Sequence, residues 1–309
     1  MPLLPPAPDF RGRSTMHNDS LTADHLRSIP SLLPTRPSAI LVISAHWEVG
    51  ADEADTPIVS VTAGETPSLL FDYSGFPPET YHYKYPAPGS PELAKRIQHL
   101  LESNEILSPL VNKPVKVVLD HERGFDHGVF VPLLLAFPSA DIPVVCLSLH
   151  RSLNPELHFS IGAKLAPLRQ EGILIIGSGV SFHNMRVLMQ NWGATRAVLP
   201  EQAAGADFDK ALRNAVLLDV NGDEKREDTV EIEASAALEL TRTLEASNST
   251  RRFRALMRWK SFPGATTAHP REEHLIPLLV AAGAGGNDEA AVIFEDVCMG
   301  AVMTGFRFG

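Results

Sequence analysis

The stretch "SAILVISAHWEVG" (residues 38–50) decides the fold. After Ser38 it contains the apolar run AILVI, and three residues later it has a histidine, His46, followed by Trp47. A strand as apolar as this run is usually covered on both faces, as in the sheets of α/β proteins. Ligand sites of open α/β sheets lie beyond the carboxyl ends of the strands, which is where His46 falls. A single histidine does not establish a site, whereas several histidines in the same setting would indicate one.

The composition is that of an ordinary globular protein. The chain has 309 residues, of which 44% are hydrophobic and 21% charged, and it can bury a sizeable core without disulfides. A net charge of −10 argues against nucleic acid or an anionic membrane as the main partner, because phosphate binding needs a positive field. Cys146 and Cys298 lie in apolar runs and are expected to be reduced and buried. With no membrane-length apolar run and no secretory signal, the chain is predicted to be cytoplasmic.

Predicted strands and helices alternate along the chain. Strands are expected at 38–46, 57–63, 115–120, 142–150 and 172–179, and 290–308 supplies one long or two short closing strands. Helices are expected at 20–33, 90–104, 127–138, 154–169 and 270–286. Ser90 is the predicted N-cap of the second helix. This alternation predicts an α/β sheet, and no clean boundary divides the chain, so we expect one domain.

Four of the twelve histidines share one setting. His46 ends a buried strand, His127 opens a helix in "GFDHGVF", and His183 follows the strand and turn of "ILIIGSGVSFHN". His274, in "AHPREEHLIPLL", is placed at the first turns of an apolar helix. Either each ring caps a helix or is satisfied in the core, or all four converge on one cleft, which is the interpretation we favour. Neutral imidazole is the commonest metal ligand and suits Fe, Zn and Cu, and the wide spacing requires a site assembled from distant strands.

Five segments stand out along the chain: "AILVISAHWE", "YPAPGSPELAKRI", "GFDHGVFVPLLLAFPSADIPVVCLSL", "LAPLRQEGILIIGSGVSFHNMR" and "AHPREEHLIPLLVAAGA". Together, in the expected order over nearly the whole chain, they resemble the DODA-type, class III extradiol ring-opening dioxygenases. The resemblance implies one α/β catalytic domain over residues 1–309, with a central, mostly parallel sheet flanked by helices. It implies a divalent metal, Fe(II) or alternatively Zn(II), and opening of a small, DOPA-like catechol by O₂; a homo-oligomer is possible.

The resemblance also implies roles for the histidines. His46, His183 and His274 match metal-binding positions, and His183 matches a position described either as a ligand or as the acid/base beside the metal. His127 matches a catalytic histidine that faces the substrate. Because the wider superfamily uses a glutamate as its last ligand, Glu273 competes with His274. Neighbours on a helix point about 100° apart, so only one of the two is expected to bind, and we prefer His274.

One departure concerns the N-terminus. The family begins with a strand that ends in a metal-binding histidine and a glycine-rich turn followed by "PLL", and this chain starts at "MPLL". The first strand and its ligand are therefore expected to be missing, through a misassigned start codon or in a genuine short paralogue. His17, in "TMHND", is a candidate replacement, although its setting is that of an ordinary residue entering the first helix. The corresponding alternative functions are a non-catalytic, metal-deficient paralogue and a zinc-dependent hydrolase or isomerase.

Other residues are expected to support the site. Asp126 and Asn184 are predicted to orient histidine rings, because the second ring nitrogen of a catalytic or ligating histidine needs a partner. Trp47 and Trp259 are predicted to lie in the core. The long loop at 68–90 either walls the substrate pocket or packs as a surface loop. Its aromatic and histidine side chains are Phe71, Tyr73, Phe76, Tyr81, His82 and Tyr85.

Overall fold

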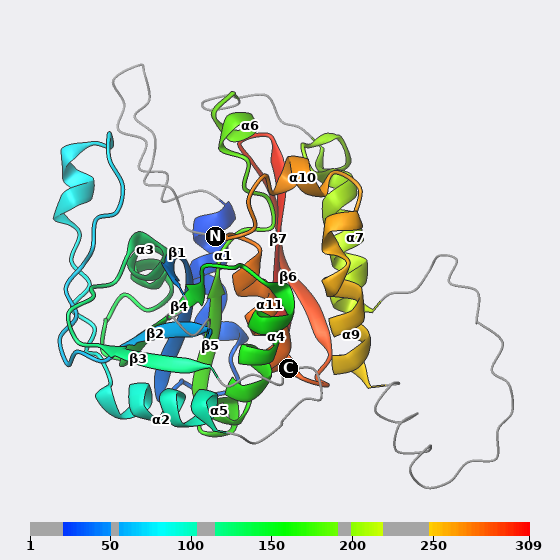
Figure 1. Cartoon of the computed structure of the whole chain (residues 1–309). Coiled ribbons are helices and arrows are strands. Elements are labelled where there is room, and N and C mark those ends of the chain that lie inside the picture. The colour runs from blue at the N-terminus through cyan, green and yellow to red at the C-terminus, as the bar shows by residue number, and fades with distance from the viewer. Residues whose placement is uncertain (1–20, 51–55, 104–114, 191–198, 219–246) are drawn as a thin grey trace, which may run out of the picture.

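The computed structural model describes residues 21–50, 56–103, 115–190, 199–218 and 247–309. Within them, a five-stranded sheet has the order β3-β2-β4-β1-β5, and β6 and β7 form a separate two-stranded sheet (Figure 1). The strands are β1 (Ala39–Val49), β2 (Ile58–Thr62), β3 (Lys116–Asp120), β4 (Val144–His150), β5 (Ile173–Ser178), β6 (Ala290–Cys298) and β7 (Ala301–Phe308).

Helices connect and cover these strands. The α-helices are α1 (Leu21–Ser28), α2 (Pro91–Glu102), α3 (His127–Ala136), α4 (Pro155–Leu165), α5 (Pro167–Gln170), α6 (Met185–Gln190), α7 (Ala206–Leu217), α9 (Asn248–Met257), α10 (Ala265–Ala268) and α11 (Ile276–Gly285). Short 3₁₀ helices span Ile29–Leu32, Pro78–His82, Pro200–Gln202 and Trp259–Ser261.

The sheet is mostly parallel, as predicted. β1 runs parallel to both of its neighbours, β4 and β5, and β2 runs parallel to β3. Only the β2–β4 pairing in the described sheet is antiparallel. The carboxyl ends of β1, β4 and β5 therefore meet at one edge of the sheet, which is where a ligand site is expected.

The predicted strand in the opening stretch is covered on both faces. Successive side chains of a strand point to opposite faces, and Ile40 and Val42 enter a core cluster with residues of α3. Leu41 and Ile43 enter the other cluster, with residues of α2, α4 and α11. All four side chains are almost fully buried. The β1 strand is thus held between two layers of helices, and its carboxyl end is fixed in place.

Several local predictions can be compared with the structure. Ser90 caps α2 by accepting a hydrogen bond from the backbone N–H of Leu93 at 3.2 Å, as predicted. The closing segment forms two strands, β6 and β7. Both cysteines are free and Cys146 is buried, but Cys298 is only half-buried, because it lies at the end of the two-stranded sheet. None of the described helices has the length and apolar character that a bilayer crossing requires.

The last helix begins later than predicted, and its N-terminus packs closely on the end of β5. α11 starts at Ile276, so the residues before it, including His274, form a turn. The carbonyl oxygen of His274 accepts the backbone N–H of Val180 at 3.0 Å. A Cβ atom on Gly179 would lie 2.2 Å from this oxygen, so only glycine allows the approach.

We therefore expect Gly179→Ala to lower the free energy of unfolding by about 1–3 kcal/mol, the usual cost of a forced backbone or core shift. Urea denaturation measures the change. Gly50→Ala is the matched control, because a Cβ there would meet only the Arg151 side chain, at 3.8 Å. The control is expected to leave stability unchanged or slightly higher. Equal stability of the two variants would contradict the close packing described here.

Candidate active site

The four histidines named from the sequence lie in one cluster, which we call the histidine cluster. The ring centroids of His46 and His127 are 4.0 Å apart, and those of His46 and His274 are 5.0 Å apart. The ring of His183 stacks on that of His274 at 3.5 Å. Side chains from β1, the start of α3, the turn after β5 and the turn before α11 therefore meet at one edge of the sheet.

His46 is placed by an irregular part of β1. Between Ile43 and Glu48, β1 advances by five residues while β4 advances by two. Such a bulge re-aims side chains and is common beside active sites. The backbone N–H of His46 donates to the hydroxyl of Ser44 at 3.2 Å, and this hydroxyl donates to Oδ1 of Asp126 at 2.7 Å. The bulge, and with it His46, is thus tied to the residue before α3.

His127 is held by a carboxylate from the long loop at 68–90. Oδ1 of Asp72 accepts the backbone N–H of His127 at 3.0 Å and lies 2.7 Å from its ring Nδ1. Oδ2 of Asp72 lies 3.5 Å from Nδ1 of His46. Asp72 could not be predicted as a partner of His127, because nothing near it in the chain indicates a contact with a residue 55 positions away.

The second group contains His183, Glu273 and His274, whose ligand atoms lie within 4.8 Å of one another. Nδ1 of His183 lies 3.2 Å from Oε1 of Glu273. The predicted helical position of Glu273 and His274 was wrong: both precede α11, so helical spacing does not limit the site to one of them. The preference for His274 as the ligand stays a prediction. The extended geometry of a turn lets adjacent side chains reach the same place. Asp72, His46 and His127 form the other such group among the described residues.

The predicted orienting roles of Asp126 and Asn184 were also wrong. Asp126 accepts from Ser44 and pairs with Arg123 at 3.2 Å, so it acts on the backbone of the β1 bulge instead of on a ring. The side-chain amide of Asn184 donates to the carbonyl of Thr267 at 2.8 Å. The carboxylates that face imidazole nitrogens are Asp72 and Glu273, which come from segments far away in the sequence.

Burial keeps two of the rings neutral. Desolvation, together with neighbouring His127, lowers the pKa of His46 to about 4. Desolvation and the neighbouring histidines also lower the pKa of His274, which is 3% exposed. Neutral imidazole is the form that binds a metal. Nε2 of His46 and Nδ1 of His274 are buried and have no hydrogen-bond partner among the described residues. Each of these orphaned nitrogens has the chemistry of a metal ligand, and the two rings belong to the two adjoining groups of the cluster.

Glu273 carries a negative charge beside these rings. Burial alone would raise the pKa of its carboxyl group, but the contact with His183 and the nearby Arg271 outweigh burial and lower it. Arg271 lies 3.3 Å from Oε2 of Glu273 and also pairs with Glu48 of β1 at 2.6 Å. The anionic carboxylate is therefore fixed between β1 and the turn before α11.

The family is decided by comparison with known proteins. The profile of the catalytic LigB subunit of aromatic ring-opening dioxygenase matches residues 11–307. The chain belongs to this family. It is 37% identical over 269 residues to 4,5-DOPA dioxygenase extradiol of Beta vulgaris, which covers 87% of this chain and 81% of that relative. The protein of the same name from Portulaca grandiflora is 38% identical over 261 residues, covering 84% and 78%.

A solved structure is also similar to this chain in both fold and sequence. The crystal structure of uncharacterized protein JW3007 from Escherichia coli K12 has a TM-score of 0.62 and 30% identity, covering 92% of this chain and 90% of that one. Membership of the LigB family confirms the predicted family, the α/β fold and the assignment to ring-opening dioxygenases. His17, considered as a replacement ligand, lies outside the described residues.

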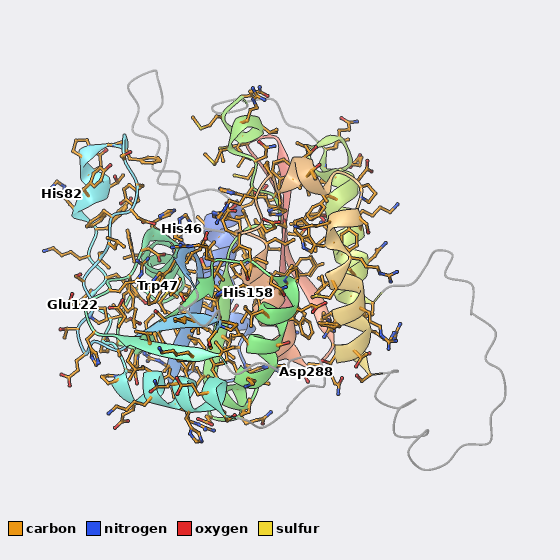
Figure 2. The ribbon with its side chains drawn as sticks, viewed as in Figure 1. His46, Trp47, His82, Glu122, His158 and Asp288 are labelled. Atoms are coloured by element: carbon orange, nitrogen blue, oxygen red, sulfur yellow. The ribbon has the colours of Figure 1, made fainter. Side chains whose placement is uncertain are left out.

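In this LigB-family chain, part of the loop at 68–90 lies against the histidine cluster. The ring of Tyr73 meets that of His127 edge-on at 5.6 Å, and Phe71 meets Phe130 of α3 at 5.5 Å. Tyr85 is buried in the core. Figure 2 shows His82 at the outer end of the loop, away from His46. The loop is thus partly a wall of the cluster and partly a surface segment.

Trp47 and Trp259 are buried in the two core clusters, as predicted.

Proposed function

We propose that the chain is an Fe(II)-dependent extradiol dioxygenase that opens the ring of a small catechol with O₂, next to its two hydroxyl groups. The single observation that supports this most is the pair of buried, unpartnered imidazole nitrogens on His46 and His274 within a cluster of four histidines. Residues 1–309 form one catalytic domain in this proposal, supported by the family match over 11–307. The free cysteines favour a cytosolic location.

Three histidines would hold the metal in this proposal. His46 and His274 offer unpartnered nitrogens, and His183 stacks on His274. Glu273 is the competing ligand; if it takes the third position, His183 is left as the acid/base beside the metal. Fe(II) bound there would supply a Lewis acid for the catechol oxygens and a redox centre between substrate and O₂.

The remaining chemistry is proton transfer by the chain's own side chains. Where Glu273 is the third ligand, His183 takes a proton from a catechol hydroxyl, and Glu273, 3.2 Å from its Nδ1, stabilises the charged ring that results. His127 exchanges a proton with the substrate on the other side of the cluster, and Asp72 holds its ring in place. Tyr73, edge-on to His127, restricts the space beside the reacting ring. These groups bring the reacting atoms together before any bond is broken.

The proposal is tested by anaerobic loading of the full chain with Fe(II), followed by addition of O₂ and a panel of catechols. An oxygen electrode measures uptake, and absorbance detects the yellow ring-opened product. We expect O₂ uptake in proportion to product with at least one small catechol, 3,4-dihydroxyphenylalanine being the first choice. A Zn(II)-loaded sample is the control and is expected to consume no O₂. Fe(II)-loaded protein that leaves every catechol intact would contradict the proposal.

A further inference from the structure

Asp72 lies between two rings of the histidine cluster and faces both through Nδ1. One oxygen is 2.7 Å from Nδ1 of His127, and the other is 3.5 Å from Nδ1 of His46. The Asp72 side chain is only 20% exposed, although its backbone lies at the surface. The same Oδ1 of Asp72 also accepts the backbone N–H of His127 at 3.0 Å, so this carboxylate acts as an acceptor towards α3.

An acceptor of this kind decides which ring nitrogen carries the proton. A neutral imidazole has one donor nitrogen and one acceptor nitrogen, so a carboxylate facing Nδ1 favours a proton on Nδ1 and a lone pair on Nε2. In His46, Nε2 is the buried nitrogen without a described partner, which is the lone pair that a metal needs. In His127, the same tautomer leaves Nε2 able to take and return a proton.

The two contacts differ in strength. His127 gives Asp72 two short contacts to one oxygen, from the backbone N–H and from the ring. The 3.5 Å separation from His46 is at the limit of a hydrogen bond, so Asp72 acts on that ring mainly through its charge. Removal of the charge and removal of the whole group should therefore affect the two rings differently.

We propose that Asp72 is a positioning residue for both histidines. Its single carboxylate sets the Nδ1–H tautomer of His127 and that of His46. The loop at 68–90 thus prepares the metal ligand and the proton-exchanging histidine together. The roles of the two rings rest on the proposed function, whereas their tautomers do not. Carboxylates that orient metal-binding histidines in this way are usually needed for full metal affinity.

The test compares Asp72→Asn with Asp72→Ala in the full chain. In Asp72→Asn, the amide oxygen is expected to keep the two contacts with His127, which turns the NH₂ group towards Nδ1 of His46. Two facing donors repel, so the proton of His46 moves to Nε2, where it competes with the metal. In Asp72→Ala, both rings lose their partner. Glu79→Gln is the matched control, because it removes an exposed carboxylate from the same loop.

Three measurements follow each variant: the ¹⁵N shifts of the ring nitrogens in the metal-free protein, the Kd for Fe(II) alone by anaerobic chelator competition, and kcat and KM. For Asp72→Asn we expect His46 with its proton on Nε2, His127 unchanged, and Fe(II) affinity lower by about 10- to 100-fold. For Asp72→Ala we expect both tautomers to change, a similar loss of affinity, and a further fall in kcat at saturating Fe(II) with little change in KM. Glu79→Gln should match the wild type throughout.

Several results would overturn the inference. A wild-type protein in which His127 or His46 carries its proton on Nε2 would contradict the inference. This measurement needs no variant, so it remains decisive even if a variant fails to fold. Wild-type affinity and tautomers in Asp72→Asn would do so as well, as would an equal loss in Glu79→Gln. If the wild type opens no catechol but tautomers and affinity behave as expected, the proposed function fails and this inference stands. If the wild type opens catechols but Asp72→Asn binds Fe(II) with wild-type affinity, the proposed function stands and this inference fails.

Discussion

Replacement of His46 by alanine is expected to abolish stoichiometric Fe(II) binding and to lower kcat/KM for catechol opening by at least about 10³-fold. The neutral ring of His46 presents a buried Nε2 to the cluster with no other described partner. Loss of a bound metal removes several kcal/mol of transition-state stabilisation, and each 1.36 kcal/mol is about tenfold in rate. Anaerobic Fe(II) titration and oxygen-uptake kinetics measure the two effects separately.

The control for this variant is His82→Ala, which removes an exposed histidine at the outer end of the loop at 68–90 (Figure 2). It is expected to keep wild-type Fe(II) affinity and kcat/KM. Fe(II) binding by the His46 variant with wild-type affinity would show that His46 is no ligand. Activity that survives in such a variant would remove the main support for the proposed metal centre.

Replacement of His127 by alanine is expected to lower kcat by about 10²- to 10⁴-fold while Fe(II) affinity changes by only a few fold, since removal of a general acid/base has effects of this size. Nδ1 of His127 faces Asp72 at 2.7 Å, whereas the buried ring nitrogens of the cluster that have no described partner belong to His46 and His274. We therefore expect His127 to act on the substrate and not to hold the metal. Single-turnover kinetics at saturating Fe(II) separate the chemical step from binding.

The His46 variant provides the comparison for this result. If His127→Ala loses Fe(II) as completely as His46→Ala does, His127 is a metal ligand, and the group of His46, Asp72 and His127 holds the ion instead. If kcat is unchanged, His127 takes no part in proton transfer. Either outcome would change the assignment of the cluster while leaving the family membership untouched.

Much of the fold could be predicted from local patterns. The apolar run of β1 predicted a strand covered on both faces, and Ser90 followed by Pro91 marked the start of α2. The start of α11 was misplaced although a signal was present. Proline is tolerated in the first turn of a helix, and both Pro270, at the predicted start, and Pro277 suit that position; the structure begins the helix at Ile276, before Pro277. That error placed Glu273 and His274 on a helix, whereas the structure has them in the turn before it.

The histidines of the site could be predicted because each lies near the carboxyl end of a strand or near the start of a helix, and topology alone brings such positions together. Asp72 and Glu273 could not be assigned as orienting groups, because their contacts depend on how a long loop and a turn fold back onto the sheet. Asp126 shows the opposite error. It is the immediate neighbour of His127 in the sequence and occupies the N-cap position of α3, but its side chain accepts a hydrogen bond from Ser44 and not from a ring nitrogen.

The most direct test of the central claim is opening of a catechol under ¹⁸O₂ by the Fe(II)-loaded full chain, with the product analysed by mass spectrometry. The account predicts a product that contains both atoms of one O₂ molecule, with the ring opened next to the two hydroxyl groups. A product with one labelled atom or none, or a ring opened between the hydroxyl groups, would contradict extradiol dioxygenation by this histidine cluster.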